Sequence, residues 1–159
     1  MRFVVERDAL SDGVAWVSRS LSSRPIMPVL LGVVIDAQKN GVHLSGYDLE
    51  TSAKATINAD VKEEGRVLVS GRLLSDIAKS LPNKPVTISL DGNRVSVVSG
   101  STKFALPTLP VSDYPTLPEL PSETGRLTGE VFAQAVHQVA IAAGKDDSLP
   151  VLTGVHVEI

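Results

Sequence analysis

The sequence predicts an α+β fold in which two helices pack on an antiparallel sheet, and it predicts that this domain is repeated along the chain. A motif at residues 28–33, Pro-Val-Leu-Leu-Gly-Val, occurs again at residues 150–155 as Pro-Val-Leu-Thr-Gly-Val. Two segments carry one apolar stripe each with helical spacing. The segments between them are β-rich and joined by short turns, which favours antiparallel pairing. Helices with a single apolar stripe bury it against a sheet, which gives a layered α+β domain.

The duplication extends beyond the six-residue motif. One copy starts at Pro28 and the other at Pro150, and the same offset of 122 residues aligns an apolar stripe ahead of each copy. The aligned positions are Leu10 with Phe132, Val14 with Val136, Val17 with Val139, and Leu21 with Ala143. We therefore predict a repeated domain of this period. The expected boundaries are a complete domain at 1–122, ending in a proline-rich linker at 107–121, and the start of a second, truncated domain at 123–159.

Local patterns predict the elements of the first domain. Apolar residues at i, i+4, i+7 and i+11 indicate a helix at 7–21, which Pro25 ends because proline disfavours helical geometry at the residue before it. A second stripe indicates a helix at 71–80, with Ser70 as its N-cap and Pro82 as its stop. The expected strands are at 2–6, 29–37, 42–47, 49–58, 66–70, 86–90, 94–99 and 102–106. The order is strand, helix, four strands, helix and three strands.

Turns and the second copy complete this outline. Residues 39–41 end in Asn-Gly, which favours a type I′ hairpin turn because both residues tolerate positive φ angles. Residues 107–121 hold five prolines and are expected to form an extended linker. In the second copy we expect a helix at 130–143, capped by Gly144, and a strand at 149–159.

The composition is that of an ordinary globular protein. The chain has 159 residues, 43% of them hydrophobic, with a mean hydropathy of +0.15 and a net charge of −3. This charge does not predict tight nucleic-acid binding, although it allows a local basic face. The absence of cysteine excludes disulfides and thiolate metal sites. We find no signal peptide and no apolar run near the ~18 residues that a membrane span requires, so we expect a cytoplasmic protein.

No pattern in the sequence is typical of an enzyme. His43, His137 and His156 lie in different expected elements without ligand spacing. There is no phosphate-binding glycine loop, no nucleophile elbow and no zinc-protease motif. The pair Asp146-Asp147 is too little to predict a metal site. We therefore expect no catalytic residue, no metal and no cofactor.

Two features could serve binding. Arg72 and Lys79 are seven residues apart and share the exposed face of the second helix, while Arg24 lies in the break after the first helix. These cations could contact phosphates, or they could be ordinary surface charges. On the strand at 102–106, Phe104 and Leu106 point the same way. They could fill the core of the domain, or they could form an edge that pairs with another subunit.

The chain resembles the bacterial beta sliding clamps, the processivity subunits of the replicative DNA polymerase III. The segments that carry the resemblance are residues 2–21, 24–30 (Arg-Pro-x-x-Pro-Val-Leu), 44–50 (Leu-Ser-Gly-Tyr-Asp-Leu-Glu), 69–77 (Val-Ser-Gly-Arg-Leu-Leu-Ser-Asp-Ile) and 104–110 (Phe-Ala-Leu-Pro-Thr-Leu-Pro). The linker and residues 146–155 look actinobacterial. The match follows the family order along the whole chain.

The resemblance implies three similar domains per chain and a head-to-tail dimer that encircles double-stranded DNA without reading its sequence. It implies a non-catalytic role with three kinds of partner: the catalytic subunit of DNA polymerase III, the clamp loader and other proteins with clamp-binding motifs. The residues it assigns are Arg24, Arg72 and Lys79 facing DNA, Lys103, Phe104 and Leu106 at the dimer edge, and Leu152 in the peptide pocket between the second and third domains.

Some features depart from the family pattern. The second copy has Asp146 where the first has Arg24, so the second loop is not expected to hold phosphate in the same way. The chain lacks a third domain and most of the second, so we expect a fragment of a longer clamp. The alternative is a protein-interaction adaptor that uses its sheet edges and does not encircle DNA.

Overall fold

The computed structural model describes residues 1–22, 24–119, 121–123, 125–146 and 148–158. The chain forms two compact units, Met1–Pro118 (unit 1) and Glu119–Ile159 (unit 2). Within the described residues, unit 1 contains a nine-stranded antiparallel sheet, two α-helices and two short 3-10 helices, and unit 2 contains one α-helix and one 3-10 helix. None of the described helices has the length and apolar character needed to cross a membrane.

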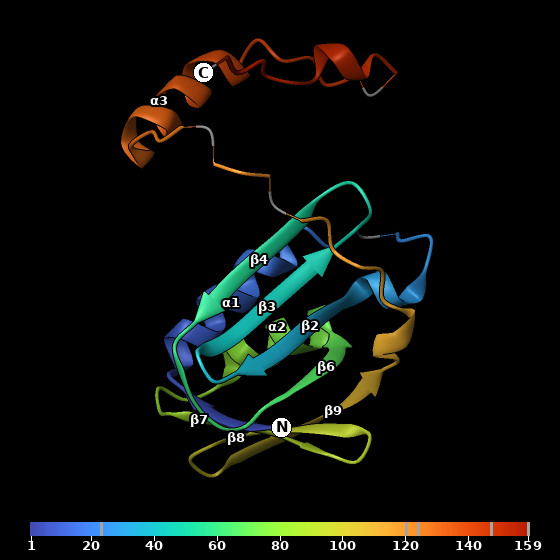
Figure 1. Ribbon diagram of the computed structural model, residues 1–159, viewed down its shortest axis with the longest axis vertical. Helices are drawn as coiled ribbons and strands as arrows, with labels where there is room; N and C mark the ends of the chain where they lie inside the picture. Colours follow the sequence, from blue (N-terminus) through green and yellow to red (C-terminus); the bar gives the residue numbers. More distant parts are fainter. Residues whose placement is uncertain (23, 120, 124, 147, 159) are drawn as a thin grey trace. The chain divides into compact units, whose positions relative to one another are not determined.

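The elements of unit 1 follow the expected order, except that five strands and not four lie between the two helices (Figure 1). The helices are α1 (Arg7–Ser18) and α2 (Gly71–Ser80), and the 3-10 helices are η1 (Pro28–Leu31) and η2 (Val111–Asp113). The strands are β1 (Arg2–Val5), β2 (Gly32–Gln38), β3 (Gly41–Tyr47), β4 (Ser52–Ile57), β5 (Ala59–Glu63), β6 (Gly65–Ser70), β7 (Val86–Asp91), β8 (Arg94–Ser99) and β9 (Thr102–Leu109). Their order in the sheet is β4-β3-β2-β6-β9-β8-β7-β1-β5.

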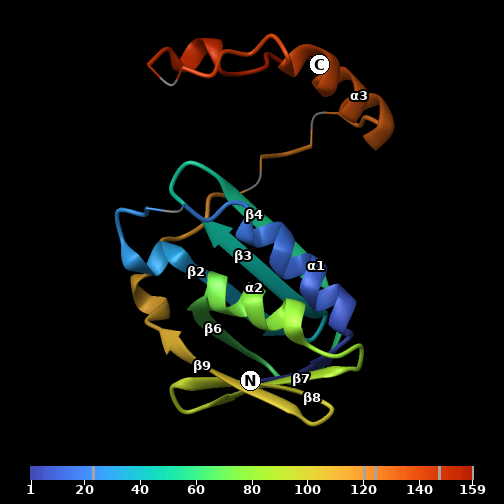
Figure 2. The same ribbon diagram turned by 180° about the vertical axis from the view of Figure 1, so that it is seen from behind.

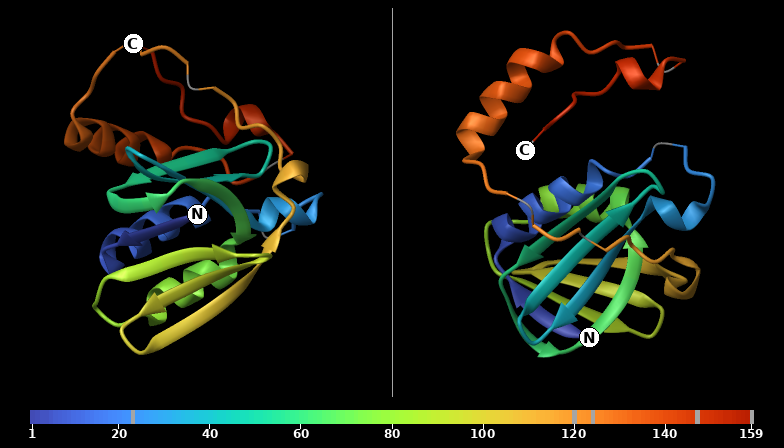
Figure 3. Two further views of the ribbon diagram at one scale, coloured as in Figure 1. Left: turned by 60° about the horizontal axis from the view of Figure 1, so that its bottom comes forward. Right: turned by 45° about the horizontal axis from the view of Figure 1, so that its top comes forward.

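The sheet has two halves that share β9. Residues 102–107 of β9 pair with β8, whereas Thr108 and Leu109 pair with β6. Strands β4 and β5 lie at opposite ends of the strand order, yet only Asn58 separates them in the sequence, so the sheet must curl back on itself. Both helices lie on the same face of β2, β3 and β6 (Figure 2). Figure 3 shows the two halves diverging from β9 with the helices between them.

The main core of unit 1 lies between the helices and the sheet. From α1 it takes Leu10, Val14 and Val17, which are at most 1% exposed, and from α2 it takes Leu74. Burying an aliphatic side chain of this size stabilises a fold by about 1.5–3 kcal/mol, so this face fixes the helices on the sheet. The apolar stripe therefore predicted the helices correctly, although α1 ends at Ser18.

A second apolar cluster covers the opposite face of β2 and β6. It is built on Val34 and Leu68 and is covered by Leu30 of η1 and by Tyr114, which is 8% exposed. Tyr114 belongs to the segment that the sequence predicted to be an extended linker. That prediction is wrong for its first part, because 107–109 extend β9 and the following residues pack against the sheet.

The repeated motif is a 3-10 helix in both copies, and the strand predicted at 29–37 begins only at Gly32. In unit 1 the Leu30 amide donates to the Met27 carbonyl at 3.0 Å. In unit 2 the 3-10 helix η3 spans Pro150–Leu152, and the Thr153 amide donates to the Pro150 carbonyl at 3.1 Å. Proline fixes φ near −65°, which suits the first position of such a turn.

Two local predictions in the β2–β6 region are wrong. Of the described non-glycine residues, Leu49 alone has a positive φ, at 81°, so the turn at 39–41 is not of type I′; the positive φ falls on Gly41, at 135°. The strand expected at 49–58 is β4 only, because the Asp48 carboxylate accepts the Glu50 and Thr51 amides in a turn before it. Strand β5 then follows as an additional element.

Unit 2 repeats the first elements of unit 1 without their core. Helix α3 spans Gly129–Ala140, shorter than the expected 130–143, and it has no buried residue. Phe132 is 46% exposed, although the aligned Leu10 is 1% exposed. The strand expected at 149–159 is wrong for the described residues, where η3 is followed by irregular chain. The cap predicted at Gly144 is also wrong: the helix ends at Ala140 with Ile141 as its C-cap, and the Gly144 amide donates to the Leu152 carbonyl at 2.7 Å.

Candidate nucleic-acid interface and sheet edges

The exposed face of α2 carries two of the predicted cations. Ser70 caps this helix by accepting the Leu73 amide at 3.4 Å. This cap fixes the start of the helix and thereby places Arg72 in its first turn. Arg72 and Lys79 are both exposed, and neither forms an ion pair with any described residue. Lys79 lies in the last turn, where a cation complements the helix dipole. Seven residues of helix separate the two cations by about 10 Å along the axis.

Arg24 lies in the segment between α1 and η1. Its side chain is exposed, and its amide donates to Ser22 Oγ at 3.2 Å. The start of α2 packs closely against the segment after α1, since a Cβ on Gly71 would lie 2.3 Å from Leu21 Cδ1. Arg72 therefore lies near the C-terminal end of α1, where the chain continues toward Arg24.

The structure adds a cation that the sequence reasoning missed. Arg19 follows the last residue of α1, and its guanidinium carbon lies 5.8 Å from the centre of the Trp16 ring, a cation–π contact. Trp16 is 54% exposed. Their i, i+3 spacing on the polar side of the helix was the available signal. Asp8 and Asp12 are exposed earlier on α1, so the helix face is mixed in charge.

The structure separates the three residues predicted for the dimer edge. Leu106 is 1% exposed and belongs to the main core, so its side chain is not available to a partner. Phe104 is partly buried against the same core, and Lys103 is exposed. Among the described residues, 102–106 of β9 pair with β8 on one side only. This stretch therefore offers a backbone edge together with Lys103 and part of Phe104.

Leu152 lies in η3 of unit 2 and is 60% exposed. It does not line the apolar hollow of unit 2, which measures about 320 Å³. That hollow is formed by the apolar face of α3, including Val131, Phe132 and Val136, and by the chain at 155–158. The described part of unit 2 thus exposes an apolar surface on α3 and leaves Leu152 outside it.

The described residues contain no group of three or more metal-ligating side chains. Of the pair considered for a metal, Asp147 lies outside the described residues. Asp146 accepts the Ser148 amide at 3.0 Å, and hydrogen bonding by Ser148 lowers the pKa of the Asp146 carboxyl. His43 contacts Thr56 Oγ1 through Nδ1 at 3.0 Å, on a different element from the other two histidines.

Comparison with known proteins identifies the fold of unit 1. Residues 1–118 match the family model described as the N-terminal domain of the DNA polymerase III beta subunit. The chain belongs to this family. The matched residues coincide with unit 1, which carries the helix face and the sheet edges described above.

The relatives of the chain share its whole length. It is 57% identical over 159 residues to a beta sliding clamp of Streptomyces coelicolor and 55% identical to one of Micrococcus luteus, covering 42% and 51% of those proteins. The crystal structure of the sliding clamp from Bacillus subtilis superposes with a TM-score of 0.88 at 27% identity, over 97% of this chain and 43% of that one. The chain thus spans about half the length of the curated relatives it matches.

Proposed function

We propose that this chain is part of a sliding clamp, a processivity factor that encircles duplex DNA and tethers the replicative polymerase. The observation that carries the proposal is the 57% identity, over the whole chain, to a protein named a beta sliding clamp. The layered fold supports it, because one face of the sheet is covered by helices with exposed cations. Unit 1 would be the first of three clamp domains and unit 2 the start of the second.

The proposed mechanism is topological and needs no catalytic group. A closed ring stays on DNA that has no free end, so its contacts with DNA can be weak. Arg24, Arg72 and Lys79 would make phosphate contacts that carry no sequence information and weaken with salt. The carboxylates of Asp8 and Asp12 on the same helix layer would keep the attraction small, which suits a protein that slides.

Ring closure would use the sheet edges. The one-sided stretch of β9, with Lys103 and Phe104, would pair with the third domain of a second subunit in a head-to-tail dimer. Leu152 would contribute to a peptide pocket that takes short motifs from the polymerase catalytic subunit and the clamp loader. Both assemblies require parts of the protein beyond this chain, and we place their action in the cytoplasm.

Retention on DNA tests the proposal. The full-length protein is loaded by its clamp loader onto a nicked circular plasmid, and the bound fraction is followed before and after a restriction enzyme linearises the DNA. We expect the protein to remain on the circle and to leave the linear form within minutes. Equal loss from both forms would contradict the proposal.

The alternative is an adaptor that does not encircle DNA, and the open backbone edges of β4 and β9 favour it. An adaptor would bind a partner strand by main-chain hydrogen bonds, which depend little on salt. Salt-independent capture of a partner by the 159-residue chain, together with failure to stay on circular DNA, would establish this function instead.

A further inference from the structure

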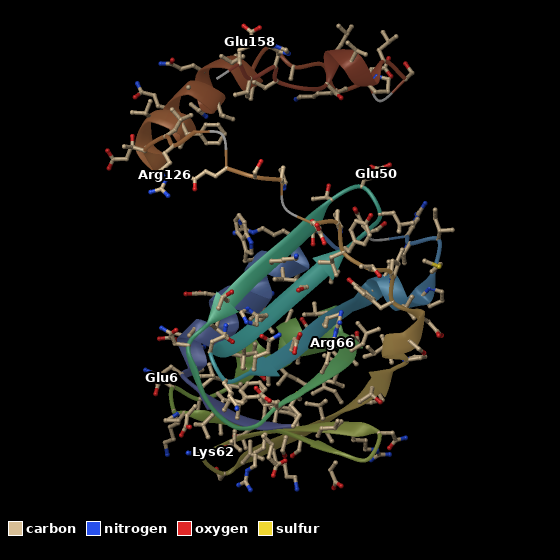
Figure 4. All side chains as sticks on the ribbon, in the orientation of Figure 1. Glu6, Glu50, Lys62, Arg66, Arg126 and Glu158 are labelled. Atoms are coloured by element: carbon tan, nitrogen blue, oxygen red, sulfur yellow. The ribbon has the colours of Figure 1, made fainter. Side chains whose placement is uncertain are left out.

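A polar hollow lies on the face of the sheet that is turned away from α1 and α2. It measures about 400 Å³ and is bordered by β2, β3, β4 and β6 and by Thr116 and Leu117, which cross this face after η2. Figure 4 labels Arg66 on this face, where β2 and β6 lie side by side. The hollow belongs wholly to unit 1 and is separate from the helix face and from the edge of β9.

Strand register gathers the polar side chains of the hollow into one row. In the strand register, Asp36 of β2 lies opposite Arg66 on one neighbouring strand and opposite His43 on the other. His43 lies in turn opposite Thr56 of β4. Lys54 lies two residues from Thr56 on β4 and therefore points to the same face. Cations from β4 and β6 thus flank a polar centre contributed by β2 and β3.

Most polar groups of this centre already have partners. The Asp36 carboxylate accepts the Gln38 amide nitrogen at 3.1 Å, and the His43 ring contacts Thr56 Oγ1 at 3.0 Å. Lys54 and Arg66 differ, because neither forms an ion pair with any described residue. Two unneutralised cations at the rim of a hollow, in a chain of net charge −3, are suited to an anionic ligand.

The geometry of the hollow favours a peptide over a nucleic acid. Lys54 and Arg66 stand three strand spacings apart and are offset by two residues along the strands. Their backbones are therefore roughly 16 Å apart, which matches two carboxylates four to five residues apart in an extended peptide. Leu117, which is only partly buried, borders the space between the two cations and can contact an apolar side chain. A duplex would need a longer track of cations than these two side chains supply.

We propose that this hollow binds an acidic peptide segment of a partner protein. Arg66 holds one carboxylate through its planar guanidinium, Lys54 holds a second, and an apolar side chain between them contacts Leu117. Because the hollow and the helices lie on opposite faces of the sheet, a segment bound here leaves the helix face of unit 1 accessible.

Fluorescence anisotropy with the 159-residue chain tests this site. The probe is a fluorescein-labelled hexapeptide, Asp-Glu-Leu-Leu-Asp-Glu, and we expect saturable binding with a Kd of about 1 mM or below. Arg66→Gln and Lys54→Gln should each weaken binding about tenfold, because each removes a charge-assisted hydrogen bond. Lys62→Gln is the matched control: this exposed cation on β5 pairs with Asp60 outside the hollow, and its loss should leave the Kd unchanged.

Three outcomes would overturn the proposal. These are no saturation at several millimolar peptide, equal loss of affinity in the Lys62→Gln control, or tighter Arg66-dependent binding of a short DNA duplex, which would make the ligand a nucleic acid. Far-UV circular dichroism verifies the fold of each variant, and Lys54→Gln decides the matter if Arg66→Gln does not fold. Retention on circular DNA does not enter this test, so the two proposals stand or fall separately.

Discussion

The two copies of the repeat share a local structure and differ in what covers it. In unit 1, α1 is followed by η1 and buries Leu10, Val14 and Val17 under a nine-stranded sheet. In unit 2, α3 is followed by η3, and the aligned Phe132 and Val139 are about half exposed. The helix and the 3-10 turn are thus encoded by local sequence, whereas the core depends on strands that lie much later in the sequence. Matched changes in the two units test this difference, from the largest expected effect to the smallest.

The helix stripe should show the largest effect. Leu10→Ala removes a fully buried side chain from the main core and should lower the free energy of unfolding by about 2–5 kcal/mol. Phe132→Ala at the aligned position should change it by less than about 0.5 kcal/mol, because that ring is 46% exposed. Urea denaturation followed by circular dichroism measures both. Similar losses in the two variants would mean that α3 has a core of its own.

The glycines of the repeated motif form the second pair. A Cβ on Gly32 would lie 2.5 Å from Leu68 Cδ1 and 2.9 Å from the Val29 carbonyl oxygen, whereas a Cβ on Gly154 would meet no atom of the described residues within 4 Å. Gly32→Ala should therefore cost about 1–3 kcal/mol through overpacking, and Gly154→Ala should be nearly neutral. The same denaturation assay applies. A neutral Gly32→Ala would show that the close packing of η1 on β6 is not needed.

The helix caps should differ by less. Ser70 accepts the Leu73 amide at the start of α2, whereas Thr128 makes no side-chain cap bond at the start of α3. We expect Ser70→Ala to cost about 1 kcal/mol and Thr128→Ala to leave the thermal midpoint unchanged. Thermal unfolding at one protein concentration makes the comparison. A larger shift of the thermal midpoint in Thr128→Ala than in Ser70→Ala would contradict the expectation that the cap of α2 is the more stabilising one.

Alkaline pH should produce the smallest effect. Burial raises the pKa of the Tyr114 phenol, although the Tyr47 backbone and the charge of Arg66 partly offset this. The proton is therefore held more tightly in the folded state. Stability from this group is complete below pH 10 and falls as the pH rises toward the folded pKa.

Urea denaturation between pH 9 and 11 measures this dependence, with Tyr114→Phe as the control that should flatten the curve. Asp146 of unit 2 has a lowered pKa but is fully exposed, so its titration in acid should not change the unfolding of unit 1. An unfolding free energy that keeps the same slope in Tyr114→Phe would contradict the assignment.

The sequence predicts this fold where local patterns decide the structure. The stripes of α1 and α2 and the Ser70 cap are confirmed because they depend on residues within a few turns of helix. The extension of β9 past Pro107 was missed, because that segment becomes a strand through the pairing of Thr108 and Leu109 with β6, which is distant in the sequence. The 3-10 turn at Pro28–Leu31 was also missed, because the residues after Pro28 have high β-propensity and were interpreted as a strand.

The candidate site residues also divide into those that local sequence determines and those that tertiary packing determines. The exposure of Arg72 and Lys79 follows from helix periodicity and was predictable. The burial of Leu106 depends on tertiary packing. Its position on a strand was compatible with a role in the core and with a role at the dimer edge. The outer hollow could not be predicted, because it depends on the register that sets Asp36 beside Arg66 and on the later segment at 116–117.

Hydrogen exchange of the 159-residue chain tests the central difference between the two copies most directly. The amides of Val14 and Val17 in α1 should exchange only through global unfolding, because the core of unit 1 encloses that helix. The aligned amides of Val136 and Val139 in α3 should exchange orders of magnitude faster, as in a short helix with little tertiary support. Equal protection of the aligned amides would contradict the account, since it would give unit 2 a core of its own.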